Sequence, residues 1–229
     1  MNVTSRRALQ ADSPEPSADS RCPFLAYHDV LGAEYVGGLL DYVVARQSDF
    51  RTGLMHNRET GAVVADPVRR DSVYLTELGA FLRPIRAFVS TIAAPALRAL
   101  HLSEPRVEPR EFVVTAYRDG GHIGEHIDTY ERPEWVRILS CVYYFAVTPR
   151  RFSGGELRLY GLPKGPAVER QLNSSYVDVE PRTDTLVVFP SWLRHQVMPV
   201  QVPSGAWLDS RFTVNCWMHR ASGPSHARS

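Results

Sequence analysis

Cysteine is scarce in this sequence. The 229 residues include only three cysteines, Cys22, Cys141 and Cys216, which lie far apart and form no C-x-x-C pair. An odd, sparse set of this kind argues against a disulfide framework. We therefore expect reduced thiols and a cytoplasmic location.

The sequence also lacks a long apolar segment, a signal peptide and a basic run. No apolar stretch approaches the roughly 20 residues that a transmembrane helix needs, and no apolar stretch follows Arg6 and Arg7 as a signal peptide would require. The formal net charge is +1, and the arginines are spread along the chain. We expect neither nucleic acid nor a membrane as the main partner. The oligomeric state stays open.

The composition is that of an ordinary globular protein, since 44% of the residues are hydrophobic and 22% are charged. Residues 1–22 are rich in Ser, Ala, Asp and Pro and are expected to form a disordered leader. Residues 23–229 are expected to form a single domain. Within it, a helical part over residues 28–105 precedes a β-rich core over residues 110–219.

Two helices are predicted in the first part of the domain. Apolar residues recur at helical spacing over residues 29–47. A second helix is predicted from Asp71, a suitable N-cap, to about Val89. Pro84 and Pro95 are expected to kink or divide this second helical region.

The texture of the sequence changes after Pro109. Short runs rich in β-branched and aromatic residues are separated by turns. They are EFVVTAY, VRILSCVYYFAV, GELRLYG, SYVDVE, DTLVVFPS, HQVMPV and SRFTVNCWMH. Strands at this spacing predict a jelly-roll sandwich or barrel, so the fold class is α+β with N-terminal helices packed on a jelly-roll, cupin-like core.

The segment GGHIGEHIDTY, residues 120–130, permits two readings as a metal site. On a helix, His122, Glu125 and His126 would have the H-x-x-E-H spacing of an inverted zinc-peptidase motif. On a strand, His126-x-Asp128 would be half of a non-haem iron site. The two readings require different backbones.

Glycine favours the strand. Three glycines lie in or beside residues 122–126, and each interior helical glycine costs about 1 kcal/mol. On a strand, residues i and i+2 share a face, so His126 and Asp128 converge on one side. An H-x-[DE] match alone is weak evidence, because roughly one is expected by chance in a chain with 8 histidines and 25 acidic residues.

An iron site of this type needs one more histidine from a distant strand. His195 is suited, since it follows the apolar run TLVVFPS and opens the next strand; the alternative is a packed or surface histidine. Arg211 lies in a strand whose apolar and polar residues alternate. A guanidinium on an inward face requires a planar carboxylate partner, and its fork suits one from a ligand. An internal salt bridge or an exposed edge strand is the alternative for Arg211.

These residues belong to an ordered series over about residues 110–219 that resembles the prolyl 4-hydroxylase-like branch of the 2-oxoglutarate and Fe(II)-dependent dioxygenases. The series is Tyr117 in AYRDGG, HID at 126–128, CVYYF at 141–145, SGGELRLYG at 153–161, VVFPS at 187–191, HQVMPV at 195–200 and RFTVNCWMH at 211–219. Each part alone is weak, and the ordered match is specific. The resemblance implies a double-stranded β-helix core.

The resemblance implies that His126, Asp128 and His195 bind Fe(II), with no catalytic residue beyond these ligands. It also implies 2-oxoglutarate and O2 as cosubstrates, with ascorbate as a further candidate. Asp128 counts against halogenation, because halogenating members lack this carboxylate.

The resemblance further implies that Arg211 holds the distal carboxylate of 2-oxoglutarate. Tyr144 would hydrogen-bond the same carboxylate, and Tyr117 would line the pocket. Two features depart from the family pattern. The segment between His195 and Arg211 is long, and Asn215 stands where a small hydroxyl residue is often found.

The expected function is hydroxylation of a prolyl or other amino-acid or peptide C–H bond, with release of succinate and CO2. The alternatives are hydroxylation of a small-molecule natural product and a non-catalytic, cupin-like binding protein. The substrate is therefore a small molecule, a peptide or a protein, and fold alone cannot choose. Whether His122 or Trp207 contacts it stays open.

Several other residues are expected to serve structure alone. Gly154 and Gly155 are expected to provide turn geometry. For Trp192, Trp207 and Trp217, packing is favoured over contact with substrate.

Overall fold

The computed structural model describes residues 15–16, 22–56, 62–104, 106–129, 136–161 and 175–221. Most of the predicted leader lies outside this described part. Within the leader, strand β1 (Glu15–Pro16) pairs with strand β2 (Leu25–Tyr27). Cys22 is fully buried, and its thiol donates to the carbonyl of Leu159.

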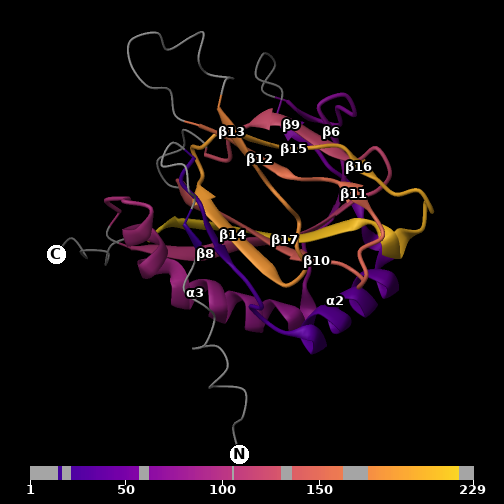
Figure 1. The fold of residues 1–229 in the computed structure, drawn as a ribbon, viewed down its shortest axis with the longest axis horizontal. Coiled ribbons are helices and arrows are strands. Elements are labelled where there is room, and N and C mark those ends of the chain that lie inside the picture. Colours follow the sequence, from indigo (N-terminus) through magenta and orange to yellow (C-terminus); the bar gives the residue numbers. More distant parts are fainter. Residues whose placement is uncertain are drawn as a thin grey trace, which may run out of the picture.

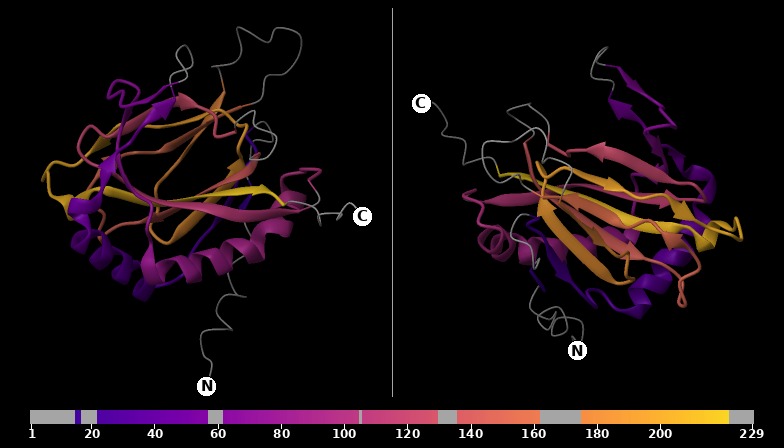
Figure 2. Two further views of the ribbon diagram at one scale, coloured as in Figure 1. Left: turned by 180° about the vertical axis from the view of Figure 1, so that it is seen from behind. Right: turned by 45° about the horizontal axis from the view of Figure 1, so that its top comes forward.

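Two helices form one layer of the molecule. Helix α2 (Ala33–Ala45) buries Val36, Leu39 and Val43, and helix α3 (Leu82–Ala99) buries a longer apolar face. Figure 1 shows both helices on one side of the main sheet, with the second sheet on the opposite side. The views in Figure 2 agree with this layering. The first predicted helix is confirmed within its predicted range.

The predicted start of the second helix is wrong. Asp71 belongs to strand β6 (Arg70–Asp71), and strand β7 (Val73–Leu75) follows it. A 3-10 turn at Gly79–Phe81 leads into α3. Pairing of β6 and β7 with neighbouring strands overrides the helical spacing of their side chains.

Helix α3 carries two prolines that were expected to kink or divide it. Pro84 lies in the first turn, where its missing N–H breaks no helical hydrogen bond. Pro95 lies inside the helix, which nevertheless continues to Ala99. The expected division therefore does not occur.

The stretch Gly79–Ala99 is long and apolar enough, by length and composition alone, to cross a membrane. No helix of this length and apolar character was expected from the sequence. In the fold, its residues Ile85, Phe88 and Val89 are buried against the main sheet. The core helix of a globular domain passes the same test, and α3 packs as such a helix.

The main sheet is antiparallel and has the strand order β1-β2-β14-β10-β17-β8-β7-β3 among the described residues. Its remaining strands are β3 (Arg51–Thr52), β8 (Val107–Tyr117), β10 (Arg137–Phe145), β14 (Thr185–Pro190) and β17 (Arg211–Arg220). The three longest strands, β8, β17 and β10, lie side by side in its centre. They form the floor on which the site is built.

The second sheet has the order β13-β12-β15-β9-β6. Its strands besides β6 are β9 (His122–His126), β12 (Leu157–Tyr160), β13 (Tyr176–Val179) and β15 (His195–Val197). Two short ribbons pair β11 (Ser153–Gly154) with β16 (Val200–Gln201) and β4 (Met55–His56) with β5 (Val63–Val64). The two facing sheets confirm the predicted jelly-roll class.

Alternation along β17 separates the core from the cavity. Phe212, Val214, Cys216 and Met218 are buried in the core beneath the helices. Arg211, Asn215 and Trp217 line the opposite side, between the two sheets. Because side chains alternate along a strand, one strand serves both layers.

Asp184 fastens the helix layer to the main sheet. This buried residue has φ 55°. Its carboxylate accepts hydrogen bonds from the backbone N–H groups of Leu31 (2.9 Å) and Gly32 (2.8 Å) and from the Tyr143 hydroxyl (2.7 Å). Gly32 is the N-cap of α2, so the carboxylate also lies at the positive end of the helix dipole.

We predict that Asp184→Ala lowers the free energy of unfolding by about 2–4 kcal/mol, because three donors lose a charged acceptor. Thermal and urea denaturation measure the loss. Asp29→Ala is the matched control, since Asp29 also has positive φ (52°) and its side chain is 77% exposed. Equal stability of the two variants would show that the backbone conformation matters and the hydrogen bonds do not.

Candidate active site

The glycine-rich segment is a strand. Residues His122–His126 form β9, so the zinc-peptidase reading, which needs a helix, is wrong. The ring nitrogens of His122 face two backbone carbonyls, those of Gly120 and Val68, each at 3.0 Å. His122 therefore ties β9 to the segment before β6 and is not part of the metal cluster. The two carbonyls raise its pKa, that of Val68 most, because both favour a protonated ring.

The structure brings together three side chains that could hold a metal ion, those of His126, Asp128 and His195. Their candidate ligand atoms all lie within 4.8 Å of one another. Nε2 of His126 is 3.6 Å from one Asp128 carboxylate oxygen, and Nε2 of His195 is 3.5 Å from the other. The cluster arises because β15 pairs with β9 in a register that sets His195 opposite His126.

Hydrogen bonds orient both imidazoles. Nδ1 of His126 is 2.9 Å from the carbonyl oxygen of Gly124, and Nδ1 of His195 is 2.8 Å from that of Leu193. A carbonyl accepts only, so Nδ1 is the protonated nitrogen in each ring. Nε2 is then left with a lone pair directed at the cluster, which is the tautomer that metal ligation needs.

Asp128 is held by its surroundings. Its carboxylate accepts a 2.7 Å hydrogen bond from Ser140, whose hydroxyl is 3.0 Å from that of Ser191. Its backbone N–H donates to the Ser191 carbonyl at 2.9 Å. Burial raises the pKa of Asp128, but His195, His126 and Ser140 outweigh burial and leave the pKa well below its usual range. The carboxylate is therefore ionised.

His195 is neutral for a related reason. Burial, reinforced by the neighbouring His126, lowers the pKa of His195 to about 4, although Asp128 opposes the change. A neutral imidazole is the form that binds a metal. Two imidazole nitrogens and one carboxylate oxygen match the donor set of non-haem Fe(II) oxygenases.

A second polar site lies around Arg211, which is 1% exposed. Its Nε donates to the carbonyl of Gly155 at 2.6 Å, and its guanidinium carbon lies 4.7 Å from the Tyr117 ring centre and 5.1 Å from that of Tyr144. Within the described residues, Nη1 and Nη2 have no hydrogen-bond partner. A buried guanidinium with two unpaired nitrogens is costly unless an anion joins it.

Two buried hydroxyl groups near Arg211 also lack a hydrogen-bond partner among the described residues. They are the hydroxyls of Tyr144 and Thr213. Burial raises the pKa of Tyr144 to about 12, so it stays a donor. Together with Arg211 they could hold the carboxylate of 2-oxoglutarate, and the residues present fit that group. Asn215 is instead bonded to the Thr115 hydroxyl at 2.9 Å.

Sequence reasoning missed Thr213 and the role of Gly155. Thr213 lies two residues after Arg211 on the same strand face, and this spacing could have identified it as a residue of the same site. Gly155 has φ 73°, and a Cβ there would lie 2.5 Å from Cδ of Arg211. The expectation that Gly155 serves turn geometry alone was therefore incomplete, because its missing side chain also makes room for the guanidinium.

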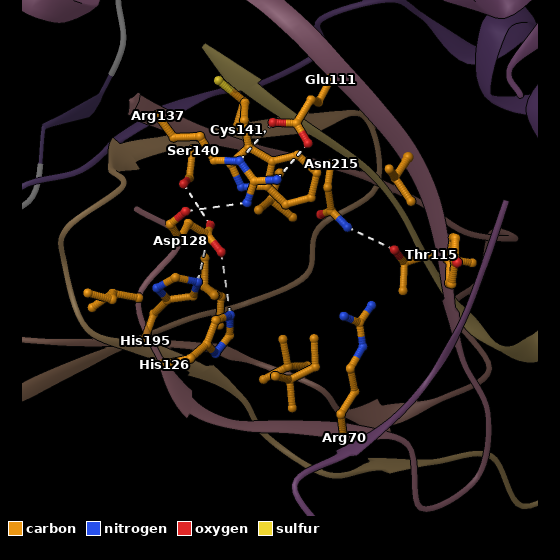
Figure 3. A pocket seen from close by; sticks show the side chains of 18 of the residues that line it. Arg70, Glu111, Thr115, His126, Asp128, Arg137, Ser140, Cys141, His195 and Asn215 are labelled. Atoms are coloured by element: carbon orange, nitrogen blue, oxygen red, sulfur yellow. Dashed lines mark hydrogen bonds and ion pairs between the residues drawn. The ribbon is translucent and has the colours of Figure 1, made fainter. Parts of the chain in front are cut away.

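Both sites open into one cavity of about 860 Å³ between the two sheets. The second sheet contributes His126, His195 and Val197, while β8 and β17 contribute the opposite wall. Figure 3 shows the labelled histidines and Asp128 on one side of the cavity and Arg70 on another.

A charged pair that could not be predicted from the sequence also lines the cavity. Arg137 donates from Nε and Nη2 to the two carboxylate oxygens of Glu111 at 2.8 and 2.6 Å. Its guanidinium lies 4.2 Å from the Trp217 ring centre and donates to the backbone oxygen of Asp128 at 3.3 Å. Trp217 lines the cavity as well and packs on Arg137.

The other tryptophans lie elsewhere. Trp207 packs between Phe50 and Phe212 and donates from its indole nitrogen to the carbonyl of Val43 at 3.0 Å. Trp192 is 42% exposed. Neither side chain lines the described cavity.

Comparison with known proteins agrees with this geometry. Residues 112–219 match the sequence profile described as the 2OG-Fe(II) oxygenase superfamily. This segment is therefore similar to members of that superfamily. A relative in Synechocystis sp. (strain ATCC 27184 / PCC 6803 / Kazusa), named uncharacterized PKHD-type hydroxylase sll0191, is 34% identical over 131 residues. The match covers 54% of this chain and 41% of that relative, so less than half of the relative's length is represented here.

Two solved structures show the same fold as this protein. A Pseudomonas putida prolyl-4-hydroxylase has a TM-score of 0.60 at 20% identity, covering 86% of this chain and 92% of its own. A Trichoplax adhaerens prolyl hydroxylase, in complex with a hypoxia inducible factor oxygen degradation domain peptide fragment, has a TM-score of 0.60 at 18% identity. That match covers 86% of this chain and 83% of the other. The predicted double-stranded β-helix core and the resemblance to the prolyl-hydroxylase branch are thereby confirmed.

We predict that His195→Ala abolishes tight binding of Fe(II), and that Ser140→Ala weakens it about 10–100-fold, because outer-shell hydrogen bonds orient a ligating carboxylate. Anaerobic titration with Fe(II), or with Co(II) followed by its visible spectrum, measures the affinity. Ser90→Ala, on the outer face of α3, is the matched control. Wild-type affinity in His195→Ala would remove this histidine from the metal site.

Proposed function

We propose that the protein is an Fe(II)- and 2-oxoglutarate-dependent dioxygenase. It hydroxylates a C–H bond of a prolyl residue or of another amino acid or peptide, with release of succinate and CO2. The observation that supports this function is that one cavity contains the His126–Asp128–His195 cluster and the partly unpaired guanidinium of Arg211. A binding protein that merely kept the fold would have no need of both groups.

In the proposed site His126, Asp128 and His195 hold Fe(II), which with 2-oxoglutarate and O2 supplies the oxidising chemistry when bound. The chain supplies position. Both imidazoles present Nε2 because backbone carbonyls occupy Nδ1. Ser140 fixes one carboxylate oxygen of Asp128 and leaves the rest of the carboxylate facing the histidines.

The proposed 2-oxoglutarate site consists of Arg211, Tyr144 and Thr213, with Tyr117 beside them. Each supplies a buried donor or an aromatic wall, and the guanidinium fork matches the two oxygens of a carboxylate. Because Arg211 is 1% exposed, its attraction for the anion is weakened little by solvent.

The substrate class rests on similarity. The relative is named a PKHD-type hydroxylase, and the two solved structures are prolyl hydroxylases, one of them bound to a peptide fragment. A small-molecule natural product is the alternative substrate. We further propose ascorbate as an auxiliary reductant by analogy with the family. The sparse, odd set of three cysteines supports a cytoplasmic site of action.

Formation of succinate tests the function directly. The purified protein is incubated with Fe(II), 2-oxoglutarate and O2, with and without prolyl peptides and small-molecule candidates, and products are searched by mass spectrometry for a gain of one oxygen. Succinate that depends on Fe(II) supports the proposal. Its absence with every candidate, in protein that binds both Fe(II) and 2-oxoglutarate, would favour the binding-protein alternative.

We predict that Arg211→Ala raises the Kd for 2-oxoglutarate at least about tenfold, because charge-assisted hydrogen bonds contribute about 1.5–3 kcal/mol each. Arg211→Lys keeps the charge without the planar fork and should lie between. Titration of 2-oxoglutarate into the anaerobic Fe(II) protein, followed by the metal-to-ligand charge-transfer band, measures the Kd. Fe(II) affinity serves as the internal control, since no metal ligand changes.

Unchanged 2-oxoglutarate affinity in Arg211→Ala would require another anchor in the cavity. Thr213→Val tests the residue that sequence reasoning missed. It keeps the shape of the side chain and removes the hydroxyl, so a smaller loss of affinity than in Arg211→Ala is expected.

A further inference from the structure

Arg70 is a second cation that faces the cavity. It lies on β6, the edge strand of the second sheet, opposite Ile123 of β9. The side chain lines the cavity, and Figure 3 shows it across the open space from Asp128 and the two histidines. Neither the metal cluster nor the Arg211 site uses it.

The side chain of Arg70 is held in this direction. Its Nε donates to the hydroxyl of Ser72 at 2.8 Å, and its Nη1 donates to the carbonyl of Leu54 at 3.2 Å. Gly53 lies against it, and a Cβ at Gly53 would come within 2.4 Å of the Arg70 Nε. An arginine that rests on a glycine and is bonded at two nitrogens has already lost much of its rotamer freedom, so a ligand that binds it loses less entropy.

The backbone that carries Arg70 is also fixed to the metal-bearing strand. The N–H of Gly124 donates to the carbonyl of Arg69 at 2.7 Å. The ring of His122 bonds the carbonyl of Val68 at 3.0 Å. His126 lies two residues after Gly124 on the same strand. The backbone at Arg70 therefore has a defined position relative to His126.

Charges in the cavity leave Arg70 without a counter-ion. Glu111 is bonded to Arg137, and Asp128 belongs to the metal cluster. No other acidic residue lines the cavity among the residues that the structure describes. Arg70 forms no ion pair with any of them, and both of its acceptors are uncharged.

We infer that Arg70 binds a carboxylate of the substrate, so that the compound oxidised is a carboxylic acid. The inference rests on the proposed function and names the substrate class of that site. Arg211 is taken by the cosubstrate, so Arg70 is the braced, unpaired cation that remains. Its free Nη2 and the second N–H of Nη1 are the donors that a carboxylate would accept from. The exposed Arg69 beside it adds positive charge to the same wall.

Trifluoroacetate is a suitable probe, because it presents a carboxylate and its fluorine signal can be followed alone. The full-length protein is loaded with Mn(II), which allows no turnover, and saturated with 2-oxoglutarate to cover Arg211. Fluorine relaxation caused by Mn(II) then reports probe bound in the cavity. We expect saturable relaxation of trifluoroacetate and none of trifluoroethanol, which has the same fluorines and no charge.

Variants assign the signal to Arg70. In Arg70→Gln the Kd for trifluoroacetate should rise at least about tenfold, whereas Arg70→Lys should keep part of the affinity. Arg98→Gln, the same charge change on the exposed face of α3, should bind as wild type. Saturable relaxation that is unchanged in Arg70→Gln, or absent in the wild type, would overturn the inference.

Competition then identifies the source of the carboxylate. Acetylglycine represents a small free acid, and an amidated hexapeptide with one Glu represents an acidic peptide. Displacement of the probe by either supports the inference and names the source, while displacement by neither overturns it. Wild-type succinate formation is independent of these measurements. A protein that makes succinate without binding the probe would retain the proposed function and lose only the proposed substrate class.

Discussion

The pairing of β15 with β9 is the interaction on which the candidate site depends. It places His195 directly opposite His126, although the two residues are far apart in the chain, and their ring centres lie 4.2 Å apart. Two strand ends thereby deliver two imidazoles to one point, and Asp128 follows β9 by two residues. A shift of one residue in this register would turn one histidine to the outer face of the sheet. The metal cluster is thus a consequence of sheet register more than of local sequence.

The arginines that line the cavity differ in how their charge is compensated. Four arginines line the cavity. Arg69 is exposed, and the other three differ in their partners: Arg137 is paired with Glu111, Arg211 bonds one backbone carbonyl, and Arg70 bonds two neutral oxygens. The first is satisfied by the protein itself. The other two are oriented by neutral acceptors and keep donors in reserve. Orientation without neutralisation is what distinguishes a binding group from a structural ion pair.

The sequence could predict the site better than the surrounding fold. Period-two alternation and the spacing of His126, Asp128, His195 and Arg211 carry the information about which side chains face inward, because strands impose a simple rule on orientation. The helix predicted from Asp71 failed, since its apolar spacing also suits short strands whose identity is set by partners far along the chain. The Glu111–Arg137 pair could not be predicted either, because it joins β8 to β10 across β17, and only the sheet order brings these strands together. The role of Gly155 could not be predicted, because it depends on where the guanidinium of Arg211 lies, and no local sequence pattern gives that position.

The long segment between His195 and Arg211 first stood out as a departure from the family pattern. Its 3-10 turn, Trp207–Asp209, carries the indole that donates to the carbonyl of Val43 on α2, and Arg211 follows two residues later. Besides the shared core, the indole of Trp207 therefore couples α2 to the strand that bears the anion anchor. For protein engineering, this means that the helical layer is not an exchangeable module. A β-core joined to helices from another protein would lose the contact between Trp207 and α2 just before Arg211, and an equivalent contact would have to be designed.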